Sequence, residues 1–446
     1  MSFYSRRCIV RKVFGLDIRP LKRAGGPILD LEKLDAAIEE HVHGAFGFLE
    51  RLVAAPSTVG EELEAQALVE LELKRLGFEV QRLPIYDSIG DDPLGGVPQI
   101  SYFGRFDLIG QLNQAKQGPS LLLNGHIDIV PAEQPDIWTS PPFEPRRTKD
   151  RLYGRGAGDM KGGFAMAALA LDALLATAPD AITGPLVFAS VIEEECTGNG
   201  TLAAARAGVL ADAVVLPEPT GLDLLLAGVG ILWLDVVITG KSAHAESADR
   251  AVNPVDLAIQ IVGALRELER EMNEIREPSM EGVAHPYNLN VGTFDAGDWP
   301  SSVPATATLR LRVGHPTAWS ADEAEARVRA AIEAIGDPWL RDHPPTIRPS
   351  GFRAKGYALS ETHPLATQLA KAHEKAHGTK PNVKAMASTT DARLYINDFD
   401  APAICYGPAA RDIHGIDESV ELQSIVDGAR TLARFIADWY AQEPIR

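Results

Sequence analysis

The chain has 446 residues, of which 45% are hydrophobic and 23% charged, an ordinary composition for a soluble globular protein long enough to form two domains. Acidic residues outnumber basic ones by 61 to 43, and the resulting net charge of −18 does not attract phosphate backbones or anionic lipid. We therefore expect no nucleic-acid partner and no membrane partner. The three cysteines are too few for a disulfide framework and favour a cytoplasmic protein.

The first half of the chain alternates helical patterns with short apolar runs. Residues 1–27 are interpreted as a possible N-terminal extension. Helices are predicted at residues 29–56 and 61–77, where the helical spacing of apolar residues ends at Pro56 and Gly77. A third helix is predicted at 162–179, among strands at 78–83, 120–130, 184–192 and 212–218. This alternation predicts an α/β domain with a mostly parallel central sheet.

The pattern changes near residue 228. Residues 230–240 alternate like an antiparallel strand with one solvated face. A helix, two strands, a helix and a strand follow at 253–275, 287–297, 305–314, 320–336 and 345–350. That order is the split βαβ pattern of a ferredoxin-like α+β domain. Because helix and buried-strand patterns return at 363–378 and 401–407, we predict a larger domain, 28–228 and 351–446, interrupted by an inserted domain at 229–350.

Two motifs in the first half place polar side chains at the ends of predicted elements. In LLLNGHIDIVP, His126 and Asp128 share one face of a strand, so that His126 presents a ring nitrogen to a metal and Asp128 holds its tautomer. A structural histidine is the alternative. In LYGRGAGDMKGG, a glycine-rich turn carries Asp159, which is a candidate ligand or a plain helix N-cap. No G-K-[ST] follows these glycines, which excludes a nucleotide-binding phosphate loop.

Three further motifs carry acids or a histidine after strands. VIEEECTGNGT crowds Glu193, Glu194 and Glu195 together, which is costly unless cations neutralise them, although a solvated acidic run is the alternative. Glu218 in VVLPEPTG and His414 in CYGPAARDIHGIDE complete the set. The agreement of the motifs predicts one metal site, because ligands gather at the carboxyl edge of an open α/β sheet. Imidazole and carboxylate together suit zinc, with cobalt or manganese as substitutes.

Seven segments, taken in order, resemble the M20 metallopeptidase family over nearly everything after residue 40: GHIDIVP, GRGAGDMKGG, EEECTGNG, PEPT, GKSAHA, STTDAR and GPAARDIH. The resemblance implies a catalytic domain interrupted by a lid domain through which two chains form a homodimer. It also implies two Zn²⁺ ions per chain. Asp159 would bridge the ions, with His126 and Glu218 completing one site and Glu195 and His414 completing the other.

The resemblance also implies catalytic roles. Glu194 would be the general base, Asp128 would orient His126, and His244 of GKSAHA would stabilise the oxyanion, within its own chain or across a dimer. The adjacent pair of acids could instead be Glu193 and Glu194, although the spacing to the following glycines favours Glu194 and Glu195.

The implied reaction is the removal of an acyl group from an N-acyl amino acid or related amine, as in acetylornithine deacetylase. A dipeptidase or carboxypeptidase of the same family is the alternative, and a non-catalytic small-molecule binder is a weaker one. Ser301 stands where the family has asparagine, which bears on the substrate. Arg312 in LRLRV and Arg393 in STTDAR are candidates to hold a substrate carboxylate, unless they are surface residues.

Overall fold

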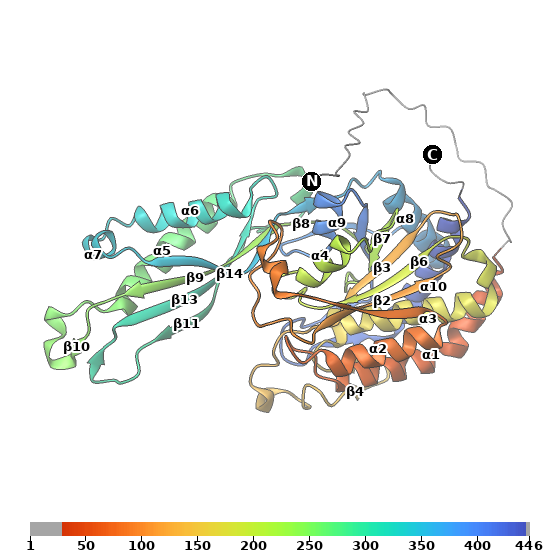
Figure 1. Cartoon of the computed structure of the whole chain (residues 1–446), viewed down its shortest axis with the longest axis horizontal. Helices are drawn as coiled ribbons and strands as arrows, with labels where there is room; N and C mark the ends of the chain where they lie inside the picture. Colours follow the sequence, from red (N-terminus) through yellow and green to blue (C-terminus); the bar gives the residue numbers. More distant parts are fainter. Residues whose placement is uncertain (1–28, 443–446) are drawn as a thin grey trace, which may run out of the picture.

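The larger domain is built around one mixed sheet with helices on both faces (Figure 1). The structure is a computed structural model that describes residues 29–442. In this range nine strands pair in the order β1-β2-β6-β3-β7-β17-β8-β15, with β16 beside β8. Their bounds are β1 Glu79–Pro84, β2 Phe106–Leu112, β3 Leu121–His126, β6 Leu186–Val191, β7 Val214–Leu216, β8 Leu224–Gly228, β15 Tyr357–Ala358, β16 Val383–Met386 and β17 Ala403–Cys405.

The predicted α/β class with an inserted α+β domain is confirmed, but the sheet is mixed rather than mostly parallel. Its centre, β6-β3-β7-β17, is parallel. On one side β1 and β2 pair antiparallel with each other and β2 with β6, and on the other side β8 pairs antiparallel with β15 and β17. Residues 85–105 join β1 to β2 without an α-helix, and such a connection gives an antiparallel pair, because a parallel pair needs a crossover.

Helices cover the two faces of this sheet unequally. Leu121 and Leu123 of β3 belong to a large core with one group of helices, whereas Leu122 faces the smaller core beneath α4 and α9. The segment Ala157–Thr177, which comprises α3 and the turn before it, is long and apolar enough to cross a membrane, but most of it is buried inside the protein, as in a core helix. The helices of the large core are α1 Leu31–Ala54, α2 Leu63–Arg75, α3 Gly162–Thr177, α8 Pro364–His377 and α10 Leu422–Tyr440, and those of the smaller core are α4 Asn199–Arg206 and α9 Ala392–Asp398.

Helix α3 begins in direct contact with the loop that follows β7. A Cβ atom built on Gly163 would lie 1.9 Å from the carbonyl oxygen of Pro217. Only glycine permits this approach of helix and loop. The contact brings the turn before α3 close to Glu218.

The inserted lid domain has a four-stranded antiparallel sheet in the order β11-β13-β9-β14, with α5 and α6 packed on it. In the sequence, α5 lies between β9 and β11, and α6 lies between β13 and β14. This connectivity, with β9 between β13 and β14 in the sheet, is the ferredoxin-like arrangement. The bounds are β9 Gly230–Thr239, α5 Pro254–Met272, β11 Leu289–Ala296, β13 Thr306–His315, α6 Ala321–Glu333, α7 Pro338–Asp342 and β14 Thr346–Ala354.

Three small features complete the description. At the far end of the lid domain, β10 (Ala243–His244) pairs with β12 (Ser302–Val303), well away from the larger domain (Figure 1). At its near end, Gly228 of β8 is the cross-strand partner of Tyr357 of β15. A second small sheet, β18-β19-β5-β4, lies in the larger domain, with bounds β4 Arg146–Arg147, β5 Arg151–Tyr153, β18 Ala410–Arg411 and β19 Ser419–Glu421.

Candidate metal centre

The five predicted metal ligands lie together at the carboxyl ends of the central strands. His126 is the last residue of β3, while Glu195 and Glu218 follow β6 and β7. Asp159 lies in the turn before α3, and His414 lies in the loop between β18 and β19. Parallel neighbours in a sheet end at the same edge, so residues far apart in sequence meet there.

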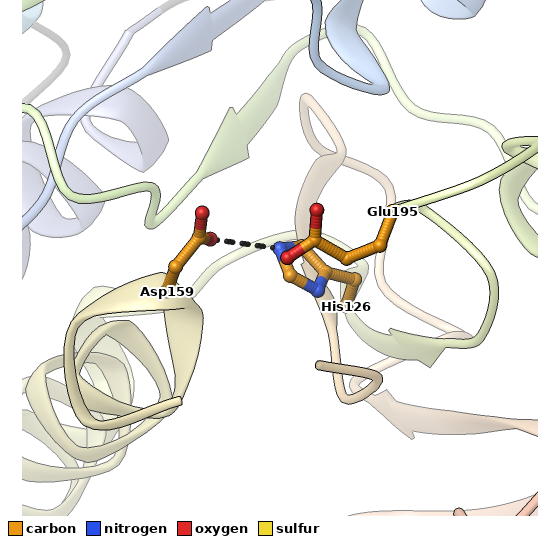
Figure 2. A group of neighbouring side chains, drawn as sticks. All are labelled: His126, Asp159 and Glu195. Carbon is orange, nitrogen blue, oxygen red and sulfur yellow. Dashed lines mark hydrogen bonds and ion pairs between the residues drawn. The ribbon is translucent and has the colours of Figure 1, made fainter. Parts of the chain in front are cut away.

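Asp159 lies between the two histidines. Its Oδ1 is 3.1 Å from Nε2 of His126, and its Oδ2 is 3.5 Å from Nε2 of His414. Each histidine also has its own glutamate: Glu218 Oε2 is 3.9 Å from His126 Nε2, and Glu195 Oε1 is 3.0 Å from His414 Nε2. Ligand atoms of His126, Asp159 and Glu195 all lie within 4.8 Å of one another, and Figure 2 shows these side chains converging.

The charges of this cluster favour the binding of cations. Burial raises the pKa of Glu218 to about 8 and raises the pKa of Glu194 well above its ordinary value. Burial also acts to raise the pKa of Asp159, but His126 and His414 outweigh burial and lower it. Glu195 raises the pKa of His414 to about 11, which is the response of an imidazole placed among carboxylates. Four carboxylates and two imidazoles gathered in one cluster therefore fit divalent metal ions, which would neutralise the carboxylates.

The backbone of Asp128 fixes the tautomer of His126. Nδ1 of His126 lies 2.9 Å from the carbonyl oxygen of Asp128, and since a carbonyl only accepts, Nδ1 carries the proton. Nε2 then presents its lone pair to the cluster. The carboxylate of Asp128 lies farther from the ring, at 3.7 Å, and accepts instead from the backbone N–H groups of Glu194 and Glu195 at 3.2 and 3.1 Å.

Of the three adjacent acids, Glu193 turns away from the pocket. It is fully buried and has a left-handed φ of 63°. Its carboxylate pairs with Arg105 at 2.5 Å and accepts from the hydroxyls of Tyr102 and Thr197. Glu194 and Glu195, in contrast, both line the pocket. The positive φ separates the direction of Glu193 from that of its two neighbours.

A pocket of about 490 Å³ opens over the cluster, and its walls are mainly apolar. Arg312 of β13 also lines it, and its Nη2 donates to the carbonyl of Ala387 and the hydroxyl of Ser388 at 3.1 and 3.2 Å. Burial lowers the pKa of Arg312. Among residues 29–442, no carboxylate lies within ion-pair distance of this guanidinium. The apolar side chains of the wall include Leu225, Ile231, Trp233, Phe352, Met386 and Ile413.

Three other predicted site residues lie elsewhere. Arg393 does not line the pocket, because its guanidinium is buried against Asp391 at 3.2 Å and donates to the carbonyl of Thr197 at 3.0 Å. His244 and Ser301 lie at the far tip of the lid domain, where His244 is exposed. Neither lines the pocket of its own chain, and β10, which carries His244, lies at the end of the lid away from the larger domain (Figure 1).

Two residues that adjoin the site were not predicted. Arg155 and Glu418 form a buried ion pair at 2.6 Å beside Asp159 and His414. Arg155 lies within GRGAGDM and Glu418 within HGIDE, but the sequence does not indicate whether two such residues form a buried ion pair or are separately exposed.

Comparisons with known proteins place the chain in a family. Residues 122–438 match Peptidase family M20/M25/M40. A succinyl-diaminopimelate desuccinylase from Methylobacterium sp. (strain 4-46) is 31% identical over 402 residues, which cover 87% of this chain and 94% of the relative. An N-formyl-4-amino-5-aminomethyl-2-methylpyrimidine deformylase from Halalkalibacterium halodurans is 24% identical over 434 residues, covering 92% and 97%.

The fold is also similar to that of solved structures. The di-peptidase Dug1p from Saccharomyces cerevisiae superimposes with a TM-score of 0.75 at 16% identity, and the match covers 92% of this chain and 98% of that one. The family match spans most of the chain, including all five candidate ligands. The chain is therefore a metal-dependent hydrolase that belongs to Peptidase family M20/M25/M40.

Proposed function

We propose that the chain is a di-zinc amidohydrolase that removes an acyl group from an N-acyl amino acid or a related amine. One observation carries this proposal: Asp159 lies between two histidine–glutamate pairs, and Glu194 lines the same pocket without an ion pair to any of residues 29–442. A dipeptidase or carboxypeptidase uses the same chemistry and is the alternative.

The metal-holding roles follow from the separations. His126 and Glu218 would hold one ion, His414 and Glu195 the other, and Asp159 would be shared, since its two oxygens face different histidines. Zinc suits this mixture of ligands, with cobalt or manganese as substitutes. When bound, the ions would polarise the scissile carbonyl and lower the pKa of a water molecule between them.

Glu194 is proposed as the general base. Burial raises the pKa of its carboxyl group, which makes the carboxylate a stronger proton acceptor near neutral pH. It would take a proton from the attacking water and deliver that proton to the leaving amine nitrogen. Asp128 supports this role because its carboxylate holds the backbone N–H of Glu194.

Substrate contacts are proposed from the pocket wall. Arg312 has no acidic partner among the described residues and is suited to hold a substrate carboxylate. Two of the similar proteins carry names that describe acyl removal, a desuccinylase and a deformylase, and these favour the deacylase over the peptidase.

The lid tip supports a proposal about assembly. His244 is exposed at the far end of the lid, so it would act on the oxyanion only at the metal centre of a second copy. A homodimer formed through the lid domain, with Ser301 beside His244, would allow this.

Cys196 and Cys405 are both free thiols, which accords with the proposed cytoplasmic location.

A substrate panel tests the proposed function. Zinc-loaded and cobalt-loaded protein would be assayed with N-acetyl, N-succinyl and N-formyl amino acids and with dipeptides. Hydrolysis of an N-acyl amino acid that stops on chelation is the expected result. Turnover of dipeptides alone would favour the alternative, and metal binding below one ion per chain without any hydrolysis would favour a non-catalytic binder.

A further inference from the structure

A buried ion pair adjoins the metal ligands without belonging to them. Arg155 Nη1 lies 2.6 Å from Glu418 Oε2, and their side chains are only 3% and 1% exposed. Arg155 opens the glycine-rich turn that ends at Asp159, and Glu418 lies four residues after His414. The pair therefore joins two ligand-bearing loops that are more than 250 residues apart in sequence.

The carboxylate of Glu418 is surrounded by backbone amides of the Asp159 turn. Oε1 accepts from the N–H groups of Gly158 and Asp159 at 2.9 and 3.0 Å. Oε2 accepts from the N–H of Gly156 at 3.1 Å, in addition to the guanidinium. There is no spare room, because a Cβ on Gly158 would lie 3.2 Å from Oε1. These bonds fix the backbone on which Asp159 is carried.

The guanidinium of Arg155 reaches the second loop. Its Nη2 donates to the carbonyl oxygen of His414 at 3.3 Å. His414 has a left-handed φ of 62°, a conformation that a non-glycine residue keeps only when its surroundings enforce it. The plane of the guanidinium is itself held over the ring of Trp138, 5.1 Å from the centroid.

We infer that Arg155 and Glu418 are positioning residues for the metal centre. They set the separation of Asp159 and His414, and thus the affinity of the ion that these two ligands share with Glu195. The inference rests on the proposed two-metal function. Groups that hold metal ligands from behind typically contribute a factor of about 10 to 100 in metal affinity when they are removed.

Metal titration of the metal-free protein tests the inference. Zn²⁺ binding would be measured by calorimetry against a competing chelator for wild type, Glu418→Gln and Arg155→Lys, with the unfolding temperature of each metal-free protein recorded. The control is Asp35→Asn, which disrupts an ion pair with Arg434 between α1 and α10 at 2.7 Å, remote from the site. It removes a carboxylate charge from another buried arginine without touching either ligand loop.

Glu418→Gln places an amide NH₂ against backbone N–H donors and should weaken by about 10- to 100-fold the binding of one of the two ions, the one that Asp159, His414 and Glu195 would hold. Arg155→Lys keeps the charge but lacks the fork that reaches the carbonyl of His414, so a smaller loss confined to the same ion is expected. Asp35→Asn should bind both ions as wild type does.

The outcomes separate the inference from the function beneath it. Fewer than two ions bound to wild type would overturn the proposed function. Two ions in wild type, with unchanged affinities in Glu418→Gln and Arg155→Lys, would overturn the inference alone. If Glu418→Gln does not fold, Arg155→Lys decides in the same way. An equal loss of affinity in Asp35→Asn would also overturn it, since the effect would then follow stability and not ligand placement.

Discussion

The side chains near the metal centre fall into two groups: some face the pocket, and others pair with residues in the protein interior. Glu194 and Glu193 are adjacent, yet the first lines the pocket and the second pairs with Arg105 in the interior. The two carboxylates have the same chemical structure, so their different tasks follow from backbone direction and burial. A substitution at each position should therefore affect a different property of the protein.

Replacing the proposed base tests this division. Glu194→Gln keeps the shape of the side chain but cannot accept a proton, so kcat should fall by at least about 100-fold while metal content stays unchanged. Steady-state kinetics and metal analysis on the same preparation measure both. Glu61→Gln, on an exposed glutamate, is the control and should retain wild-type kcat. Wild-type kcat in Glu194→Gln would remove Glu194 from the mechanism.

Sequence patterns predicted the candidate ligand set but not the placement of every charged neighbour. The convergence of the five candidate ligands was predictable because four of them end or follow an apolar run, and such runs converge in an α/β sheet, whereas Asp159 lies in a glycine-rich turn. Nothing in the sequence favoured either Arg312 or Arg393 as a substrate contact. Only the fold shows that Arg312 lines the pocket, whereas Arg393 is paired with Asp391. The backbone contact of His126 with Asp128 has no sequence signal, since any residue supplies a carbonyl.

At the scale of whole elements, helix α3 connects two ligand-bearing loops. It begins just after the Asp159 turn, and Gly163 in its first turn contacts the carbonyl of Pro217, next to Glu218. A side chain at position 163 would force the helix away from the loop. The spacing between the Asp159 turn and Glu218 thus depends on one missing Cβ atom.

Two matched glycine substitutions test this packing. Gly163→Ala should lower the free energy of unfolding by about 3 kcal/mol, because the new Cβ would lie 1.9 Å from a backbone oxygen. Gly263→Ala in α5 meets nothing within 4 Å and should raise the same free energy by about 0.5–1 kcal/mol, since alanine favours the helix. Denaturant unfolding of both variants gives the comparison. Equal effects of the two substitutions would contradict the packing argument.

Element prediction succeeded where periodicity was long, but it missed the seven-residue strand β2 as well as short strands and the direction of strands. The order of strands and helices in the lid was predictable because most of its elements show a regular apolar pattern over ten or more residues. Strand β16 spans only Val383–Met386 and is half exposed, so its composition carried little signal. The mixed character of the central sheet was not predictable, because the direction of a strand depends on its connections in space and not on its own residues.

At the scale of the whole molecule, the metal centre is expected to govern stability as well as chemistry. Metal removal should lower the unfolding temperature, since ligands that bind only the folded state stabilise it by about 4 kcal/mol at 1,000 times their dissociation constant. The pKa of Glu218 in the folded protein is raised to about 8 by burial, above its ordinary value. Its contribution to the stability of metal-free protein is therefore present at low pH and is lost as pH rises through this value.

The stabilisation by zinc should accordingly grow between about pH 5 and pH 8. Thermal unfolding with zinc and with chelator, at each pH, measures the difference between the two unfolding temperatures. If the difference between the two unfolding temperatures stays constant or shrinks as pH rises, then the pKa of Glu218 is not raised by burial in the metal-free protein.

Gly228 and Tyr357, which lie on either side of the lid domain in the sequence, are cross-strand partners, so we expect that the lid can be deleted as a unit. The chain leaves and re-enters the larger domain at neighbouring points, so a short glycine–serine linker should replace residues 229–356 at little cost in loop-closure entropy. The shortened chain should fold and bind zinc but lose its substrate preference, because the deletion removes the pocket-lining residues Trp233, Arg312 and Phe352. Loss of zinc binding in a folded product would refute this modularity. If it holds, metal binding and substrate choice belong to separately exchangeable segments, and evolution could alter the second without disturbing the first.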